Sequence, residues 1–236
     1  MKRTVISLYD YTGEAAKPWA AAGYDCVCFD IQHSRVNPRV KRYQSGAIRF
    51  VHADLHDRSV LSEIVEQYKG AAVFMMAFPV CTDMAVSGAA HFDKKRDTDP
   101  LYQITAVDHA RWCGHVGDAL GVPYFIENPV SVLATQWRKA DHTFNPSDYG
   151  GYIPEDEAEH PTWPDYIAPR DAYPKKTCIW SGGGFQMPKM RPVDCAPGYS
   201  TQHKKLGGKS MKTKNIRSAT PRGFARAVFE AHQPTS

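Results

Sequence analysis

The stretch TVISLYDYTGEAAKPWAAAGYDCVCFD, residues Thr4–Asp30, decides how this chain folds. An apolar, β-rich run at Thr4–Tyr9 leads through a turn into a helix-like segment at Ala15–Gly23, and a second apolar run follows at Tyr24–Asp30. The order strand, helix, strand is typical of a parallel βαβ unit. This first segment therefore predicts an α/β protein.

The same alternation continues well beyond this unit. Further strands are expected at Ala47–Asp54, Ala71–Phe78 and Val122–Asn128, and further helices at Arg58–Tyr68 and Pro100–Gly121. Strands and helices that alternate in this way predict a doubly wound, Rossmann-like parallel sheet with helices on both faces. Ligands of such folds bind outside the carboxyl ends of the strands. Functional residues are therefore expected where each strand ends.

The pattern changes after Pro129, where proline, glycine and aromatic residues become frequent. This composition favours a small, irregular but packed insertion, because aromatic side chains bury surface without regular structure. One more strand is expected at Lys176–Ser181, and a last helix at Thr220–His232 with Thr220 as N-cap and Pro221 in the first position. The chain thus divides into an α/β core (1–130), the insertion (131–200) and a basic C-terminal segment with the final helix (201–236).

The composition fits one fairly large domain, or one domain with a sizeable insertion, since 42% of the 236 residues are hydrophobic. The six cysteines contain no CxxC pair, which argues against a disulfide framework and a four-cysteine zinc site. Cys113 and His115 lie close together, but no further ligands stand at metal spacing, so no metal is expected. Free thiols indicate a reducing, cytoplasmic location. No apolar run has the length of a membrane span, so no membrane partner is expected.

Charge is distributed unevenly along the chain. The formal net charge is only +4, but the stretch HKKLGGKSMKTKNIRSATPRGFAR at His203–Arg226 contains no acidic residue. Its cations are Lys204, Lys205, Lys209, Lys212, Lys214, Arg217, Arg222 and Arg226. Such a segment suits a polyanionic partner, and it equally suits a solvated, partly disordered tail. Charge alone leaves both interpretations open.

Polar groups that suit an adenosine-containing ligand follow the first three strands. The turn YDYTGEAA at Tyr9–Ala16 exposes backbone N–H groups before a helix, although Gly13 is its only glycine. Asp30 ends the second strand, where a carboxylate can hold both ribose hydroxyls, and Asp54 ends the third, near an adenine amino group. Either aspartate alone would more often be a helix N-cap. Together, at consecutive strand ends, they predict an adenosine pocket.

The fourth and fifth strands end in groups with chemical potential. A lone cysteine after an apolar strand is usually inert core. In FPVCTDMAVSGA, however, Pro79 forces a turn and small polar residues follow, so Cys81 is expected on a loop at the rim of the sheet. Glu127 ends the fifth strand, where an unpaired carboxylate is costly unless it is used. Cys81 and Glu127 would then face one crevice as a nucleophile and an acid able to protonate a substrate nitrogen.

These motifs resemble those of the cytosine-C5 DNA methyltransferases, and most closely those of short bacteriophage members of that family. The resemblance covers the first half of the chain and a stretch near its end. The similar stretches are Ser7–Tyr24 for the family's first motif, Asp30 and Asp54 for its acidic second-strand and third-motif residues, Phe78–Ala89 for its Pro-Cys loop, Glu127–Val130 (ENPV) for its Glu-Asn-Val motif, and Ile216–Val228 for its Arg-x-x-Thr-Pro-Arg segment.

The resemblance implies an S-adenosylmethionine-dependent methyltransferase fold that transfers a methyl group from this cofactor to C5 of cytosine in DNA. Cys81 would add to C6 while Glu127 holds N3 and the amino group, and the target base would leave the stack. The implied cofactor-binding residues are Asp10, Tyr11, Thr12, Gly13, Asp30, Ile31, Asp54 and Phe78. The implied substrate-binding residues are Pro79, Ser87, Asn128, Lys176 and Arg217. Residues 1–130 would then form the cofactor-binding and catalytic core, and 131–200 the recognition insertion.

Departures from the family pattern keep other functions open. Val80 precedes Cys81 and Pro129 follows Asn128, where the family has Pro and Val. The family's Gln-x-Arg-x-Arg strand has no clear counterpart, and Arg170, Lys175 and Lys176 are candidates for its charge. The same chemistry on RNA or on a free cytosine nucleotide is therefore an alternative. A catalytically inactive nucleic-acid-binding relative is another. The oligomeric state does not follow from the sequence.

Overall fold

The structure, a computed structural model, describes residues 3–195, 198, 200–207 and 210–234. Its strands are β1 (Thr4–Leu8), β2 (Asp25–Asp30), β3 (Arg39–Arg42), β4 (Ala47–His52), β5 (Ala72–Ala77), β6 (Tyr124–Pro129), β7 (His142–Phe144) and β8 (Thr177–Gly182). Its α-helices are α1 (Lys17–Ala21), α2 (Arg58–Tyr68), α3 (Phe92–Thr98), α4 (Tyr102–Leu120), α5 (Leu133–Gln136), α6 (Thr201–Lys205), α7 (Met211–Ser218) and α8 (Arg222–His232). Short 3₁₀ turns are η1 (Val86–His91), η2 (Pro146–Tyr152), η3 (Glu155–Glu157) and η4 (Pro169–Asp171).

The strands of the described residues form one mixed sheet with the order β3-β4-β2-β1-β5-β6-β8-β7. The five strands from β4 to β6 are parallel, as the sequence predicts for a Rossmann-like α/β fold. The two edges differ from a purely parallel sheet, because β3 is antiparallel to β4 and β8 is antiparallel to both of its neighbours. Thr177, which begins β8, pairs with Pro129, which ends β6. The chain therefore re-enters the sheet at the carboxyl edge and must run backwards.

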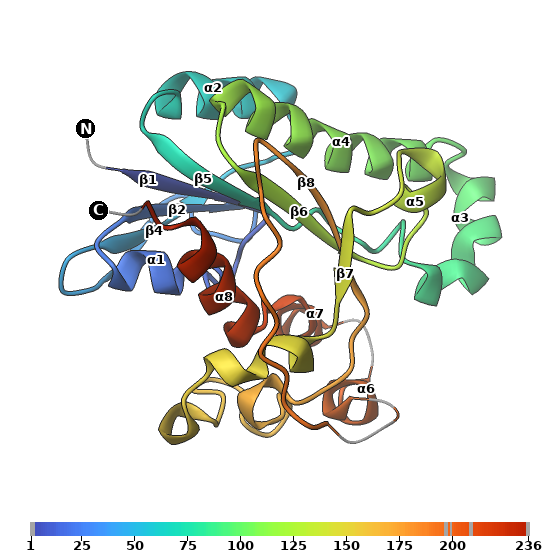
Figure 1. Cartoon of the computed structure of the whole chain (residues 1–236). Coiled ribbons are helices and arrows are strands. Elements are labelled where there is room, and N and C mark those ends of the chain that lie inside the picture. Colours follow the sequence, from blue (N-terminus) through green and yellow to red (C-terminus); the bar gives the residue numbers. More distant parts are fainter. Residues whose placement is uncertain (1–2, 196–197, 199, 208–209, 235–236) are drawn as a thin grey trace.

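Alternate residues of the central strands face opposite sides of the sheet and build two cores. On β1, Ile6 belongs to one core and Val5 to the other; on β5, Met75 and Phe74 divide in the same way. This period of two, with apolar residues on both faces, is expected for a strand covered by helices on both sides. Figure 1 shows α2 and α4 over one face and α1 and α8 over the other.

Helix α8 comes from the end of the chain but packs beside α1, where Phe229 meets Trp19 edge-on at 5.2 Å between ring centroids. The prediction of Thr220 as its N-cap is wrong, because the cap residue is Pro221 and no side chain caps the helix. Asp171 takes over this role from a distance, since its Oδ2 accepts a hydrogen bond of 2.9 Å from the Gly223 N–H.

A second group of elements lies below the carboxyl side of the sheet in Figure 1 and includes α6 and α7. These helices belong to the basic segment, and Leu206 and Ile216 bury their side chains against Ile167 and Tyr173. Lys209 lies outside the described residues. Among the residues that the structure describes, no helix combines the length and the apolar character needed to cross a membrane.

Candidate functional site

The strand order places a crevice at the carboxyl end of β1. From β1 the chain adds β2 and β4 on one side, and β5 and β6 later extend the sheet on the other side. Neighbouring connections that depart in opposite directions leave a gap above the strand ends, where ligands of open α/β sheets bind. The loops that follow β1, β2, β4, β5 and β6 therefore form the candidate site.

The turn after β1 is held from inside by Asp10. Its Oδ1 accepts hydrogen bonds from the Gly13 N–H (2.7 Å) and the Thr12 hydroxyl (3.3 Å), and its Oδ2 accepts one from the Ser7 hydroxyl (2.8 Å). Both carboxylate oxygens are thus engaged within the protein, and the side chain is buried. Asp10 consequently shapes the turn, and the backbone of the turn is what remains available to a ligand.

Two residues of this turn have backbone conformations that only a special environment allows. Gly13 has φ +70°, and a Cβ at this position would lie 2.9 Å from Cε1 of Phe50, so both conformation and space require glycine. Tyr9 has φ +58° although it carries a side chain. Its hydroxyl donates to the Leu55 carbonyl oxygen at 3.1 Å, which ties the turn to the loop after β4. Strained backbone of this kind concentrates at ligand sites.

The ends of β2 and β4 present the predicted carboxylates differently. Asp30 is buried, and burial raises its pKa although the Gln32 N–H donates to its Oδ1 at 2.8 Å. Ile31 follows with 56% of its surface exposed, which is unusual for an isoleucine and leaves an apolar surface beside Asp30. Asp54 is exposed and accepts from the His56 N–H at 3.1 Å. Tyr11 stacks on the His33 ring at 5.6 Å between centroids.

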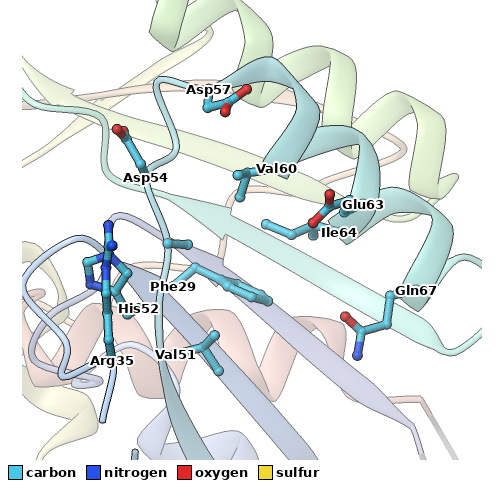
Figure 2. Close-up of a pocket in the computed structure, with 11 residues that line it drawn as sticks. Phe29, Arg35, Val51, His52, Asp54, Asp57, Val60, Glu63, Ile64 and Gln67 are labelled. Carbon is cyan, nitrogen blue, oxygen red and sulfur yellow. The ribbon is translucent and has the colours of Figure 1, made fainter.

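A pocket of about 500 Å³ lies between β4 and α2 (Figure 2). Figure 2 shows Asp54 and Asp57 on the loop before α2, with Arg35 and His52 opposite them. Arg35 donates to the His52 Nε2 at 2.7 Å. Asp54 is the one predicted binding residue that lines this pocket. Cys81 and Glu127 lie elsewhere, so the pocket is an extension beside the crevice and does not contain the candidate chemistry.

Backbone and side-chain contacts join the loops after β5 and β6. The Asn128 Nδ2 donates to the Pro79 carbonyl oxygen at 2.9 Å, and both residues are buried. Further along, the Val86 N–H donates to the Val130 carbonyl oxygen at 3.0 Å, beside a bridge between Ala85 and Ser131. Cys81 lies inside this frame, and its own carbonyl oxygen accepts from the Met84 and Ala85 N–H groups. The loop that carries the thiol is therefore fixed to the strand that carries Glu127.

Cys81 and Glu127 interact electrostatically across the crevice. Burial raises the pKa of the Cys81 thiol, the negative charge of Glu127 raises it further, and the ammonium of Lys175 lowers it in part. Burial likewise raises the pKa of the Glu127 carboxyl, against the opposing effect of Lys175. The Glu127 Oε1 and the Asn128 Oδ1 are both buried without a hydrogen-bond partner in the described residues. Such atoms are costly unless a ligand satisfies them.

The remaining predicted residues surround this centre at different depths. Phe78 is half-buried and meets Phe125 edge-on at 5.9 Å, while Pro79 is buried. The side chains of Ser87, Lys176 and Arg217 are exposed. The Arg217 carbonyl oxygen accepts from the Lys175 Nζ at 2.8 Å, so the end of α7 lies beside the cation that acts on Cys81 and Glu127.

Sequence reasoning did not single out Tyr9, whose positive φ depends on contacts with the loop after β4. It named Lys175 only among several candidate cations, since nothing near Lys175 in the sequence points to Cys81. Among the described residues, no group of three or more His, Cys, Asp or Glu side chains is arranged to hold a metal ion. All six cysteines are free thiols. No family model matches the chain, and no similar curated protein was found.

The first prediction concerns the titration of Cys81. Glu127→Gln removes a negative charge and should lower the pKa of Cys81, which raises the thiolate fraction and speeds alkylation below that pKa. Lys175→Met removes a positive charge and should have the opposite effect. Each unit of pKa shift changes the rate at a fixed lower pH by about tenfold. The measurement is the iodoacetamide rate on the Cys81 peptide against pH, by mass spectrometry. Superimposable profiles for the three proteins would show that neither charge reaches the thiol.

Proposed function

We propose that this chain is an S-adenosylmethionine-dependent methyltransferase that modifies C5 of cytosine in DNA. The observation that carries the proposal is the pairing of the Cys81 thiol with the Glu127 carboxyl at the switch point of the sheet, framed by the bond from Asn128 to Pro79. A nucleophile and a carboxyl of raised pKa in one crevice suit attack on a ring that must be protonated as it reacts. The finer methyltransferase fold is part of this proposal.

The unpartnered oxygens of the site fit the polar edge of cytosine. A protonated Glu127 carboxyl can donate to N3 of the base, and its other oxygen can accept from the exocyclic amino group. The raised pKa of Glu127 favours this neutral form, since burial disfavours the carboxylate. The buried Asn128 Oδ1 offers a further acceptor nearby. The base would have to leave the duplex stack to reach these groups.

The Cys81 thiolate would add to C6 of the bound base and move electron density to C5. Once C5 has gained the methyl group and lost its proton to a base, the bond between Cys81 and C6 breaks and the thiolate returns. Protonation of Glu127 removes the negative charge that raises the pKa of Cys81. Binding of the base to neutral Glu127 would therefore assist formation of the nucleophile.

The cofactor would lie along the turn after β1. S-adenosylmethionine, when bound, supplies an electrophilic methyl group. The backbone of Tyr11–Gly13 faces the crevice because Asp10 fixes it from behind. Asp30 has a carboxylate placed for ribose hydroxyls, and the exposed Ile31 offers an apolar surface to the adenine. These residues fit an adenosine-type cofactor.

A covalent trap tests the chemistry directly. A duplex containing 5-fluorocytosine, with S-adenosylmethionine present, should form a stable adduct with the wild type, because fluorine at C5 prevents release of the cysteine. Cys81→Ser should form none. Cys195→Ser is the matched control, since Cys195 is another thiol that is not fully buried, and it should react like the wild type. The readout is intact-protein mass.

The arms of this experiment separate the alternatives. The same trap is offered as an RNA strand and as free 5-fluorocytidine monophosphate. An adduct with either of these and not with DNA would overturn the DNA substrate and keep the chemistry. No adduct with any substrate, from a protein that binds duplex DNA, would point to an inactive relative.

Cofactor binding is tested at Asp30. Asp30→Ala should weaken S-adenosylmethionine binding about ten- to a hundredfold, the scale of removing one charge-assisted hydrogen bond. Asp93→Ala is the control, because that side chain is 92% exposed and pairs only with Arg96 among the described residues. Isothermal titration calorimetry measures both. Equal affinities for wild type and Asp30→Ala would remove Asp30 from the site.

DNA binding is tested on the basic segment, whose helix α7 ends beside Lys175. Replacement of the exposed Lys204 and Lys205 by alanine should weaken duplex binding and flatten its salt dependence, by about 0.9 in the log–log slope for each phosphate that is no longer neutralised. The control replaces Lys69 and Lys139, two exposed lysines outside the segment. Fluorescence anisotropy over a salt series gives the slopes. If the slope of the Lys204 and Lys205 variant matches that of the wild type, this part of the segment does not touch the DNA backbone.

A further inference from the structure

A second cavity, of about 260 Å³, lies on the face of the sheet covered by α1 and α8, away from Cys81 and Glu127. Its lining comes from the β1 turn, α1, the β3 hairpin and α8. The lining residues are Glu14, Lys17, Pro18, Ala21, Lys41, Tyr43, Arg222, Ala225 and Arg226. Four of these side chains are cationic and one is anionic. None of them is used in the proposed reaction.

Two of the four cations have no carboxylate partner among the described residues. Lys17 pairs with Glu14, and Arg226 pairs with Glu157. Arg222 donates only to backbone carbonyl oxygens, those of Glu157 and Ala158. Lys41 lies 5.4 Å from the centre of the Tyr43 ring and has no ion pair in the described part of the chain. The cavity therefore contains an excess of positive charge.

The surroundings respond to this excess. Burial lowers the pKa of Lys41, and the nearby positive charge of Lys17 lowers it further. Burial and the charges of Arg222 and Lys17 lower the pKa of His160 to about 4, so this histidine is neutral at physiological pH. Cations held together without matching anions are a feature of sites that receive an anion.

The cavity also contains buried polar atoms without partners. One oxygen of Glu14, Oε2, has no hydrogen bond although the side chain is only 4% exposed, and the Tyr43 hydroxyl is likewise buried and unpaired. The carboxylate oxygen accepts only, whereas the hydroxyl can donate or accept. A ligand that satisfies them must carry at least one N–H or O–H donor besides its anionic group.

Between these polar groups the wall is apolar, formed by Pro18, Ala21, Ala225 and the ring of Tyr43. The volume lies at the small end of ligand pockets, which are about 300–1,000 Å³. Two unpaired cations match a phosphomonoester, which carries about −1.5 to −2 charges at neutral pH, better than a single carboxylate. Arginine also matches the geometry of phosphate oxygens.

We propose that this cavity binds a small phosphomonoester whose organic part is flat and carries a hydrogen-bond donor, as a nucleoside monophosphate does. The phosphate meets Lys41 and Arg222, the donor meets Glu14, and the ring lies against Pro18 and Ala225. Glu14 directly follows Gly13, and its N–H contacts the Thr12 hydroxyl at 3.3 Å. A ligand here therefore touches the turn after β1 from the side opposite the crevice.

The test uses guanosine 5′-monophosphate as probe, with guanosine and inorganic phosphate as its separate halves, in calorimetric titrations of the whole chain. The intact nucleotide should bind more tightly than either half. Lys41→Met should weaken nucleotide binding by about tenfold or more, since it removes one charge-assisted hydrogen bond to the phosphate. It should leave guanosine binding unchanged. Tyr43→Phe, which removes the unpaired hydroxyl, should also weaken the nucleotide.

Lys69→Met is the control, because Lys69 is an exposed lysine at the end of α2. Lys41 is on an exposed edge strand, so its replacement does not endanger folding, and thermal unfolding verifies this. Equal nucleotide affinity in wild type and Lys41→Met would overturn the site. Binding of duplex DNA that depends on Lys41, without binding of the mononucleotide, would also overturn it. These titrations do not involve Cys81 or S-adenosylmethionine, so their outcome is independent of the proposed methyltransferase activity.

Discussion

The hydrogen bond from the Asn128 side chain to the Pro79 carbonyl oxygen is the constraint on which the candidate site depends. Parallel pairing of β5 and β6 brings their carboxyl ends together but does not fix the loops beyond them. The buried amide fixes them, because breaking the bond would leave both a donor and a carbonyl unsatisfied away from water. Cys81, two residues after Pro79, and Glu127, one residue before Asn128, are positioned by this single interaction. Each group then feels the other's charge, which neither strand alone would ensure.

Much of the sheet could be predicted because its central strands are buried on both faces. β1, β2, β4, β5 and β6 lie within the predicted ranges apart from the last residue of β6, and β8 begins one residue after the expected start. β3 and β7 were not predicted, and their residues explain why. All four residues of β3 are exposed, so no apolar alternation marks it, and β7 has only three residues. Both exist because a neighbouring strand offers an edge with which to pair, a relation that local patterns do not contain.

The site could be predicted in outline and not in its electrostatics. Strand ends locate Asp30, Cys81 and Glu127, since the chain order of an α/β fold dictates where carboxyl ends meet. The sequence also suggested that a nearby cation would lower the pKa of the thiol. In the structure burial and Glu127 outweigh Lys175, so the pKa of Cys81 is raised. The balance depends on how deeply three groups from distant parts of the chain are buried together, and no pattern of residues encodes that depth.

The antagonism between Cys81 and Glu127 has a chemical consequence. A buried thiolate and a buried carboxylate disfavour one another, so the free protein holds the pair with a proton to spare. A ligand that accepts a hydrogen bond from Glu127 stabilises the neutral acid, and the charge that opposes the thiolate disappears. Lys175 then acts on Cys81 without opposition. A site arranged in this way keeps its nucleophile mostly protonated until a base with an acceptor nitrogen is bound, because the same event that orients the base removes the electrostatic penalty on the attacking sulfur.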